Sequence, residues 1–167
     1  LQHRGQESTG IVSWDGDRLN VQRGMGKVAE IFKERRSLGR LPGDRAICHV
    51  RYSTHGKSVI HNAQPIVVKT SMGPLGVIHN GNLVNANQLR LRLEAEGSIF
   101  QTNSDTEVVL HLYARSTAGT AEDAIVESVS RVRGAFSLAM LTPNSLIAVR
   151  DPYGFRPLAL GRLGDAY

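Results

Sequence analysis

The stretch Gly76-Val-Ile-His-Asn-Gly-Asn-Leu-Val-Asn85 decides the fold that we expect for this chain. The apolar run 74–78 predicts a short buried strand. Asn-Gly predicts a tight turn over 79–82, because both residues tolerate positive φ. A leucine-periodic helix over 85–96 follows. A strand that ends in a polar turn before a helix presents backbone N–H groups beside the Asn80 side-chain amide, which suits an oxyanion hole. The same pattern also fits an ordinary strand–turn–helix connection.

The composition describes a single domain of an ordinary soluble globular protein. The chain has 167 residues, 41% hydrophobic and 21% charged, and is long enough for a sizeable core. No apolar run approaches the roughly 18 residues of a membrane span. The single cysteine, Cys48, excludes an internal disulfide and favours a reducing, cytoplasmic compartment. The chain opens on Leu1 without signal-peptide character, so we expect it to be part of a longer protein.

The charge pattern argues against a nucleic-acid partner, and the histidines argue against a metal. The net charge is +5 and the pI about 9.8, but the basic residues are scattered, with one local cluster over 33–36. Aromatic residues make up 5% of the chain, too few for base-stacking platforms. The six histidines are scattered too, and no cysteine or carboxylate cluster completes a zinc spacing. We therefore expect no nucleic acid, no membrane and no metal site for this chain.

Hydrophobic periodicity along the rest of the chain predicts an α+β protein. Further strands are expected over 10–14, 19–23, 45–51, 134–141, 145–149 and 158–162. Further helices are expected over 27–36, 104–115 and 120–132. The second of these carries a capping-box pattern between Ser104 and Glu107. The polar segment 52–64 is long for a compact domain, which suggests function. Strands, then helices, then strands indicate layers with mostly antiparallel sheets.

Six motifs stand in the order expected of one enzyme family. They are Leu1-Gln-His-Arg-Gly-Gln-Glu-Ser8, His49-Val-Arg-Tyr-Ser-Thr-His-Gly56, Asn62-Ala-Gln-Pro65, His79-Asn-Gly-Asn-Leu-Val-Asn85, Gln101-Thr-Asn-Ser-Asp-Thr-Glu107 and Arg150-Asp-Pro-Tyr-Gly-Phe-Arg-Pro-Leu158. With these motifs the chain resembles a class II glutamine amidotransferase domain over essentially its whole length. The first and last motifs are most similar to the amidophosphoribosyltransferases, which open purine synthesis.

The resemblance implies a four-layer αββα sandwich of the N-terminal-nucleophile (Ntn) hydrolase type. In that family the nucleophile is a cysteine, the first residue of the mature chain. Its own α-amino group, with a pKa near 8, is the general base. The thiolate attacks the glutamine side-chain amide, and water then hydrolyses the thioester to glutamate while ammonia departs. Leu1 matches a position downstream of the family's first strand. Residues 1–167 are thus expected to be a glutaminase domain that lacks its N-terminal strand and catalytic cysteine, and to be inactive alone.

The resemblance assigns the substrate-holding part of the site residue by residue. Arg51 is expected to bind the α-carboxylate of glutamine, since a guanidinium matches a carboxylate with two hydrogen bonds. Asp105 is expected to bind the α-ammonium, and the Asn80 side chain with the Gly81 N–H to form the oxyanion hole. The other expected pocket residues are Tyr52, Thr54 and His55, on a loop that closes over glutamine, and Arg4 and Gly5.

Cys48 is the one thiol in the chain, but we do not expect it to be the nucleophile. It lies in an apolar strand, and adjacent strand residues point to opposite faces, so His49 is badly placed to act as its base. We expect a buried structural thiol instead.

The resemblance also implies what a longer protein would hold. A phosphoribosyltransferase domain is expected beyond Tyr167, binding phosphoribosyl pyrophosphate and magnesium, with an iron–sulfur cluster in some members. The family forms homo-oligomers, typically tetramers. Two alternatives stay open on the sequence. One is another class II amidotransferase, of the glucosamine-phosphate synthase type. The other is a non-catalytic amidotransferase-like module that binds glutamine or a partner subunit.

Overall fold

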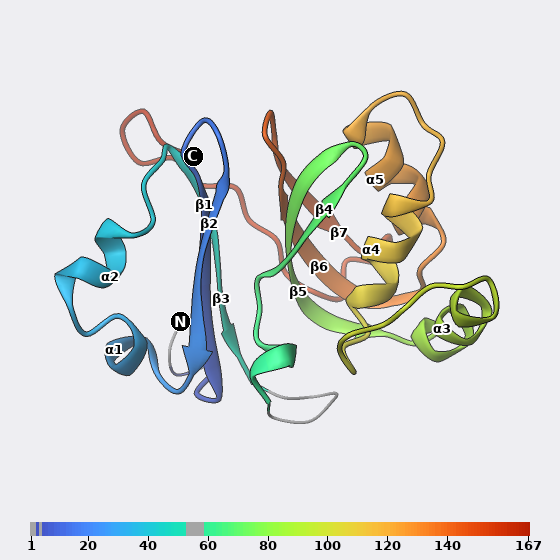
Figure 1. Ribbon diagram of the computed structural model, residues 1–167, viewed down its shortest axis with the longest axis horizontal. Helices are drawn as coiled ribbons and strands as arrows, with labels where there is room; N and C mark the ends of the chain where they lie inside the picture. Colours follow the sequence, from blue (N-terminus) through green and yellow to red (C-terminus); the bar gives the residue numbers. More distant parts are fainter. Residues whose placement is uncertain (1–2, 4, 53–58) are drawn as a thin grey trace.

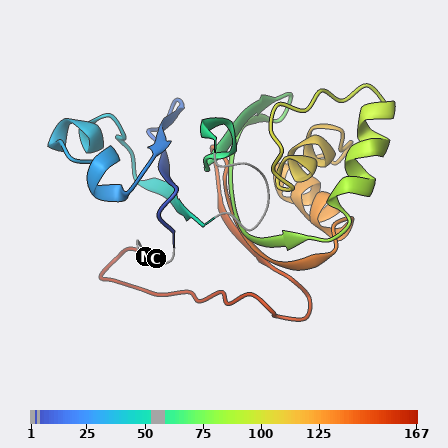
Figure 2. The same cartoon turned by 90° about the horizontal axis from the view of Figure 1, so that it is seen from below.

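The computed structural model describes residues 3, 5–52 and 59–167, arranged in four layers (Figure 1). Two antiparallel sheets lie in the middle. Two short helices lie outside one sheet and three longer helices outside the other, and the view turned by 90° separates the same layers (Figure 2). The αββα sandwich expected from the motifs is therefore confirmed.

The three-stranded sheet is built from the first three predicted strands. They are β1 (Ser8–Trp14), β2 (Leu19–Met25) and β3 (Arg45–Arg51), in the order β2-β1-β3. The helix predicted over 27–36 is instead two short helices, α1 (Val28–Ile31) and α2 (Arg35–Gly39). The charged run 33–36 offers no apolar side chain to anchor a longer helix on the sheet, so the first helix ends early.

The four-stranded sheet has the order β4-β5-β6-β7, with every neighbouring pair antiparallel. Its strands are β4 (Ile66–Thr70), β5 (Gly73–Leu83), β6 (Gly134–Leu141) and β7 (Leu146–Arg150). The predictions of β6 and β7 are confirmed. β4 is not among the predicted strands, although its Ile-Val-Val run has the β-branched character of a strand.

The turn predicted over 79–82 is wrong, because β5 continues through it. Asn80 and Gly81 both pair with residues of β6, so the sheet's hydrogen bonds override the local turn preference of Asn-Gly. Gly81 keeps a positive φ of 150°, and a Cβ there would lie 2.1 Å from the Ala135 carbonyl oxygen. The glycine is therefore required by a close approach within the sheet, and the chain turns only after Leu83.

Three helices cover the outer face of the four-stranded sheet (Figure 1). They are α3 (Ala86–Ala95), α4 (Glu107–Ala114) and α5 (Ala121–Ser130). The main core lies between them and the sheet, and its largest fully buried side chains include Tyr113, Leu75, Ile125, Leu138 and Met140. The sequence predicts α3 and α5 to within about two residues at each end.

Helix α4 begins three residues later than predicted, and the expected capping box between Ser104 and Glu107 is wrong. The Glu107 carboxylate instead accepts hydrogen bonds from the backbone N–H groups of Gln101 and Thr102, at 2.8 and 2.7 Å. Burial alone would raise the pKa of Glu107, but hydrogen bonds from His111, Gln101 and Thr102 outweigh it and lower the pKa to about 2. The ionised carboxylate therefore ties the segment before α4 to the helix.

The last segment of the chain is extended and largely exposed. The strand predicted over 158–162 is wrong, since within the described ranges this segment joins neither sheet. An isolated bridge between Leu163 and Ala166 follows it. The segment runs from β7 toward the side of the three-stranded sheet (Figures 1 and 2). In the part of the chain that the structure describes, no helix is long and apolar enough to cross a membrane.

Candidate active site

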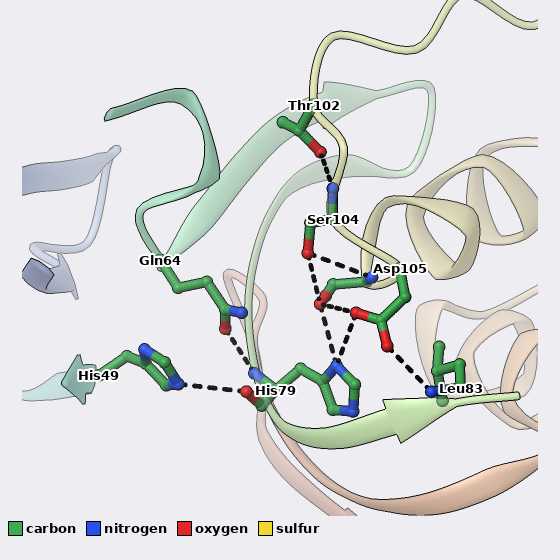
Figure 3. A network of polar contacts seen from close by, with 8 residues as sticks. His49, Gln64, His79, Leu83, Thr102, Ser104 and Asp105 are labelled. Carbon is green, nitrogen blue, oxygen red and sulfur yellow. Dashed lines mark hydrogen bonds and ion pairs between the residues drawn. The ribbon is translucent and has the colours of Figure 1, made fainter. Parts of the chain in front are cut away.

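The two sheets are joined beside the predicted oxyanion residues. His49 on β3 places its Nε2 3.1 Å from the carbonyl oxygen of His79 on β5 (Figure 3). Arg51 lies two residues after His49, so strand alternation turns both side chains toward the second sheet. Asn80 directly follows His79. The fold thus brings Arg51 and Asn80 into one region although they are distant in the sequence.

The Asp105 carboxylate is buried and anchored to β5. Its Oδ2 accepts a hydrogen bond from the Leu83 N–H at 2.9 Å, and its Oδ1 lies 3.4 Å from His79 Nδ1 (Figure 3). The Thr106 hydroxyl donates to the same Oδ1, also at 3.4 Å. The carboxylate therefore has a fixed place beside the strand that carries the predicted oxyanion residues.

Arg51 is buried at the end of β3 and is paired with an acid of the first motif. Its Nη1 lies 3.3 Å from Glu7 Oε2. Gly5 packs so tightly against β3 that a Cβ there would lie 2.6 Å from the Val50 carbonyl carbon and oxygen. A larger residue would displace the first motif from the strand. Gly5 and Arg51, which the resemblance assigns to one pocket, are thus neighbours in the fold.

Asn80 and Gly81 are adjacent on β5, inside a strand and not in a turn. Gly76, on the same face of β5 as Asn80, faces Val12 and Ile47 of the other sheet. Alternation along the strand therefore directs the Asn80 side chain to the face between the sheets, where it is exposed to solvent. The amide is accessible to a ligand on that face.

Three of the predicted pocket residues, Arg4, Thr54 and His55, lie outside the described residues, so their roles stay predictions. Tyr52 is described, at the start of the predicted closing loop, and its exposed fraction is 71%. Its ring therefore points largely into solvent where that loop begins.

Polar residues without a predicted role hold this region together. Gln64 Oε1 accepts a hydrogen bond from the His79 N–H at 2.6 Å, and Asn62 Oδ1 accepts one from the Asn103 N–H at 3.1 Å. Asn62 and Gln64 both belong to the motif Asn62-Ala-Gln-Pro65, which was the one sign in the sequence that these amides have a structural role. Both are buried in the structure. Burial lowers the pKa of His49 to about 4, so near neutral pH its ring is uncharged and suited to the contact between the sheets.

Cys48 is exposed, so the prediction of a buried structural thiol is wrong. Its neighbours Ile47 and His49 face the second sheet, and Cys48 therefore points to the outer face. β3 is an edge strand, and α1 packs on β1 and β2, so the outer face at Cys48 is left open. Its side chain points away from Arg51, which still argues against Cys48 as the nucleophile.

The described residues form no cluster suited to a metal ion, and a cavity beside α4 does not overlap the predicted site. Within residues 3, 5–52 and 59–167, no group of three or more His, Cys, Asp or Glu side chains could hold a metal ion. A cavity of about 420 Å³ lies between β4 and α4, and its lining includes Lys69, Glu107 and His111. None of the predicted site residues that the structure describes lines it.

Comparison with known proteins identifies the class of protein. The chain belongs to the glutamine amidotransferase domain family, whose model matches residues 49–167.

The similar proteins narrow this class. Amidophosphoribosyltransferase 3, a chloroplastic protein of Arabidopsis thaliana, is 51% identical over 97% of this chain and 30% of its own length. The solved glutamine phosphoribosylpyrophosphate amidotransferase of B. subtilis, complexed with ADP and GMP, is 46% identical with a TM-score of 0.92, over 99% of this chain and 35% of that one. A structure described as the allosteric regulatory enzyme of purine biosynthesis is 46% identical with a TM-score of 0.93, over 99% and 36%. The chain thus spans about a third of the length of these relatives.

Proposed function

We propose that this chain is the glutaminase part of an amidophosphoribosyltransferase. It would hydrolyse the side-chain amide of glutamine and supply the ammonia for phosphoribosylamine formation from phosphoribosyl pyrophosphate in de novo purine synthesis. The observation that carries the glutaminase proposal is that buried Asp105 contacts His79 and Leu83 of β5, the strand that carries Asn80 and Gly81, while buried Arg51 lies at the end of the facing strand β3. An amino acid carries an α-ammonium and an α-carboxylate, and this region offers the opposite charge for each. The acceptor is proposed from the names of the relatives.

The described residues would bind glutamine and stabilise the charge that develops on its amide. Arg51 would hold the α-carboxylate and Asp105 the α-ammonium. As a thiolate attacks the amide carbon, negative charge moves to the amide oxygen, where the Asn80 side chain and the Gly81 N–H would donate hydrogen bonds. Loss of one such donor typically costs about 10²–10³ in kcat. The amide nitrogen leaves as ammonia after it takes a proton, and water cleaves the thioester.

The nucleophile and the acceptor chemistry are proposed for other parts of the native protein. A cysteine with a free α-amino group would precede Leu1. A phosphoribosyltransferase domain would follow Tyr167 and hold magnesium, with an iron–sulfur cluster as in some members of the family. The greater length of the relatives supports this arrangement. We also propose a homo-oligomer, and a reducing cytoplasmic compartment on the basis of the single cysteine.

Arg51→Ala and Asp105→Ala in the full-length native protein test the proposal. Each variant should lower kcat/KM for glutamine by about 100-fold or more, because removal of a buried charged partner costs several kcal/mol. Activity with free ammonia should persist, since it bypasses glutamine. Arg92→Ala and Asp17→Ala, at exposed residues, are the matched controls and should leave kcat/KM unchanged.

Two results would contradict the proposal. An unchanged KM for glutamine in Arg51→Ala or Asp105→Ala would remove that residue from the site. If the intact native protein binds glutamine but releases no glutamate, the alternative of a non-catalytic, glutamine-binding module would be favoured.

A further inference from the structure

His79 directly precedes the proposed oxyanion residues Asn80 and Gly81 on β5, and its side chain contacts Asp105. The proposed function assigns His79 no role. It precedes Asn80 on β5, so its imidazole points to the opposite face, toward the helices, and is buried there (Figure 3). Its Nδ1 lies 3.0 Å from Thr106 Oγ1 and 3.4 Å from Asp105 Oδ1. The ring thus connects the strand of the oxyanion residues to the carboxylate proposed for the α-ammonium.

The contacts decide which ring nitrogen of His79 carries the proton. Nδ1 faces two oxygen atoms that can accept a hydrogen bond. Nε2 is buried, and no described residue offers it a hydrogen-bond partner. A buried N–H without an acceptor is more costly than a buried nitrogen lone pair, because the donor loses its hydrogen bond to water. The favoured tautomer therefore carries its proton on Nδ1 and donates toward Thr106 and Asp105.

This tautomer orients Thr106 and, through it, the Asp105 carboxylate. Thr106 Oγ1 accepts from His79 Nδ1–H and from the Ser104 hydroxyl at 3.1 Å, which leaves its own proton for Asp105 Oδ1. The other carboxylate oxygen accepts from the Leu83 N–H at 2.9 Å. One oxygen of Asp105 is thus held by the Thr106 hydroxyl, which His79 of β5 orients, and the other by the backbone of β5.

We propose that His79 is a positioning residue for glutamine recognition, which fixes the Asp105 carboxylate relative to Asn80 and Gly81 through its Nδ1–H and Thr106. The proposal rests on the proposed function. Its consequence is that the α-ammonium and the amide oxygen of glutamine are bound by one connected unit built on β5. Small displacements between such groups weaken binding and catalysis strongly, because the ligand cannot satisfy both at once.

A purely structural role for His79 would give a different result. A histidine that only fills the core would, when replaced, weaken every ligand of the site to the same extent. The proposed role acts on the α-ammonium subsite alone. Glutaramate, which is glutamine without its α-amino group, does not use that subsite and separates the two cases.

The experiment compares the KM for glutamine with the Ki of glutaramate in the full-length native protein. His79→Leu removes the donor. His79→Asn has a similar shape and places an amide N–H near the position of Nδ1. We expect His79→Leu to raise the KM for glutamine about tenfold or more and to change the Ki of glutaramate less than about threefold. The preference of the site for glutamine over glutaramate is the ratio of the glutaramate Ki to the glutamine KM. His79→Asn should restore most of this preference. His61→Leu, at an exposed histidine, is the matched control.

Equal losses for both ligands in His79→Leu would overturn the proposal, and so would an unchanged preference for glutamine. If His79→Leu does not fold, Thr106→Val removes the hydroxyl between ring and carboxylate at similar volume, and the same loss of preference is expected. A native protein that releases no glutamate from glutamine would refute the proposed function and this inference with it. Loss of preference in the variants is meaningful only where the native protein is active, so the two failures are distinguishable.

Discussion

The two halves of the sandwich are packed to different extents. The four-stranded sheet and α3–α5 enclose the large main core, whereas the cluster between the two sheets has four buried members among the described residues, Val12, Trp14, Ile47 and Leu141. On the outer face of the three-stranded sheet, α1 contributes no buried residue. The half that holds Asp105 therefore has a larger hydrophobic core of its own than the half that holds Arg51.

The candidate site takes one charged group from each half. Asp105 is held by backbone and side-chain hydrogen bonds within the well-packed half. Arg51 is paired with Glu7, whose side chain is 30% exposed. The Asp105 carboxylate is thus held in place more firmly than the Arg51 guanidinium. We expect substitutions in the four-stranded half to cost stability first, and substitutions around Arg51 to affect glutamine binding first.

The largest expected effect tests the contrast between the two cores. Leu75 is 0% exposed in the main core, and Ile47 is 5% exposed between the sheets. Leu75→Ala should lower the free energy of unfolding by about 4 kcal/mol, and Ile47→Ala by about 2 kcal/mol, because sparse surroundings collapse more readily around a cavity. Urea denaturation followed by circular dichroism measures both. Leu146→Ala, half exposed on β7, should stay within about 0.5 kcal/mol. Equal losses at Leu75 and Ile47 would abolish the contrast.

Gly81→Ala tests the close approach of β5 and β6. Its Cβ would overlap the Ala135 carbonyl oxygen at 2.1 Å, in addition to the positive φ. We expect a loss of about 3 kcal/mol, since strain of the backbone and displacement of the neighbouring strand add. Gly16→Ala is the control, because Gly16 also has a positive φ but no atom lies within 4 Å of the added Cβ. It should lose about 1 kcal/mol. Similar losses at both glycines would show that the contact with β6 is unimportant.

Acid should weaken the two halves in different pH ranges. Burial lowers the pKa of His49 from 6.5 to about 4, so the unfolded chain binds a proton there first and stability falls from pH 6.5 to 4. Hydrogen bonds lower the pKa of Glu107 from 4.5 to about 2 against the opposing effect of burial, so its contribution is lost from pH 4.5 to 2. Melting temperatures against pH should show both ranges. His49→Gln should flatten the upper range and Glu107→Gln the lower one. An unaltered upper range in His49→Gln would refute the assignment.

The smallest expected effect concerns the pairing of Arg51. Glu7→Gln keeps the shape of the side chain and removes its charge, so Arg51 should be oriented less well. We expect the KM for glutamine of the native protein to rise about threefold, as for a partly exposed ion pair. The melting temperature should change little. Glu34→Gln, at an exposed residue of the same half, is the control. An unchanged KM would show that Arg51 does not depend on Glu7.

Strand and helix positions followed largely from local sequence patterns. Alternation over 134–141 and helical spacing over 85–96 each match an element of the structure within about two residues. The predicted helix 104–115 has the right type but the wrong start, because Glu107 bonds to Gln101 and Thr102 instead of capping the turn. The local sequence pattern thus identified Glu107 as a hydrogen-bonding carboxylate but not the backbone N–H groups to which it bonds.

The sequence by itself determined the family and, through the resemblance, the layer order, because motifs are local properties of the chain; the roles of the site residues stay predictions. Only the tertiary structure decided that Asn80 and Gly81 lie within a strand, since the hydrogen bonds of β6 outweigh a turn preference. It also decided that Cys48 is exposed, because alternation gives the face of a residue but not what covers that face. The link between His79 and Asp105 crosses 26 positions of the chain, and no local pattern specifies which of several buried polar groups meet when the strand and the helix pack together.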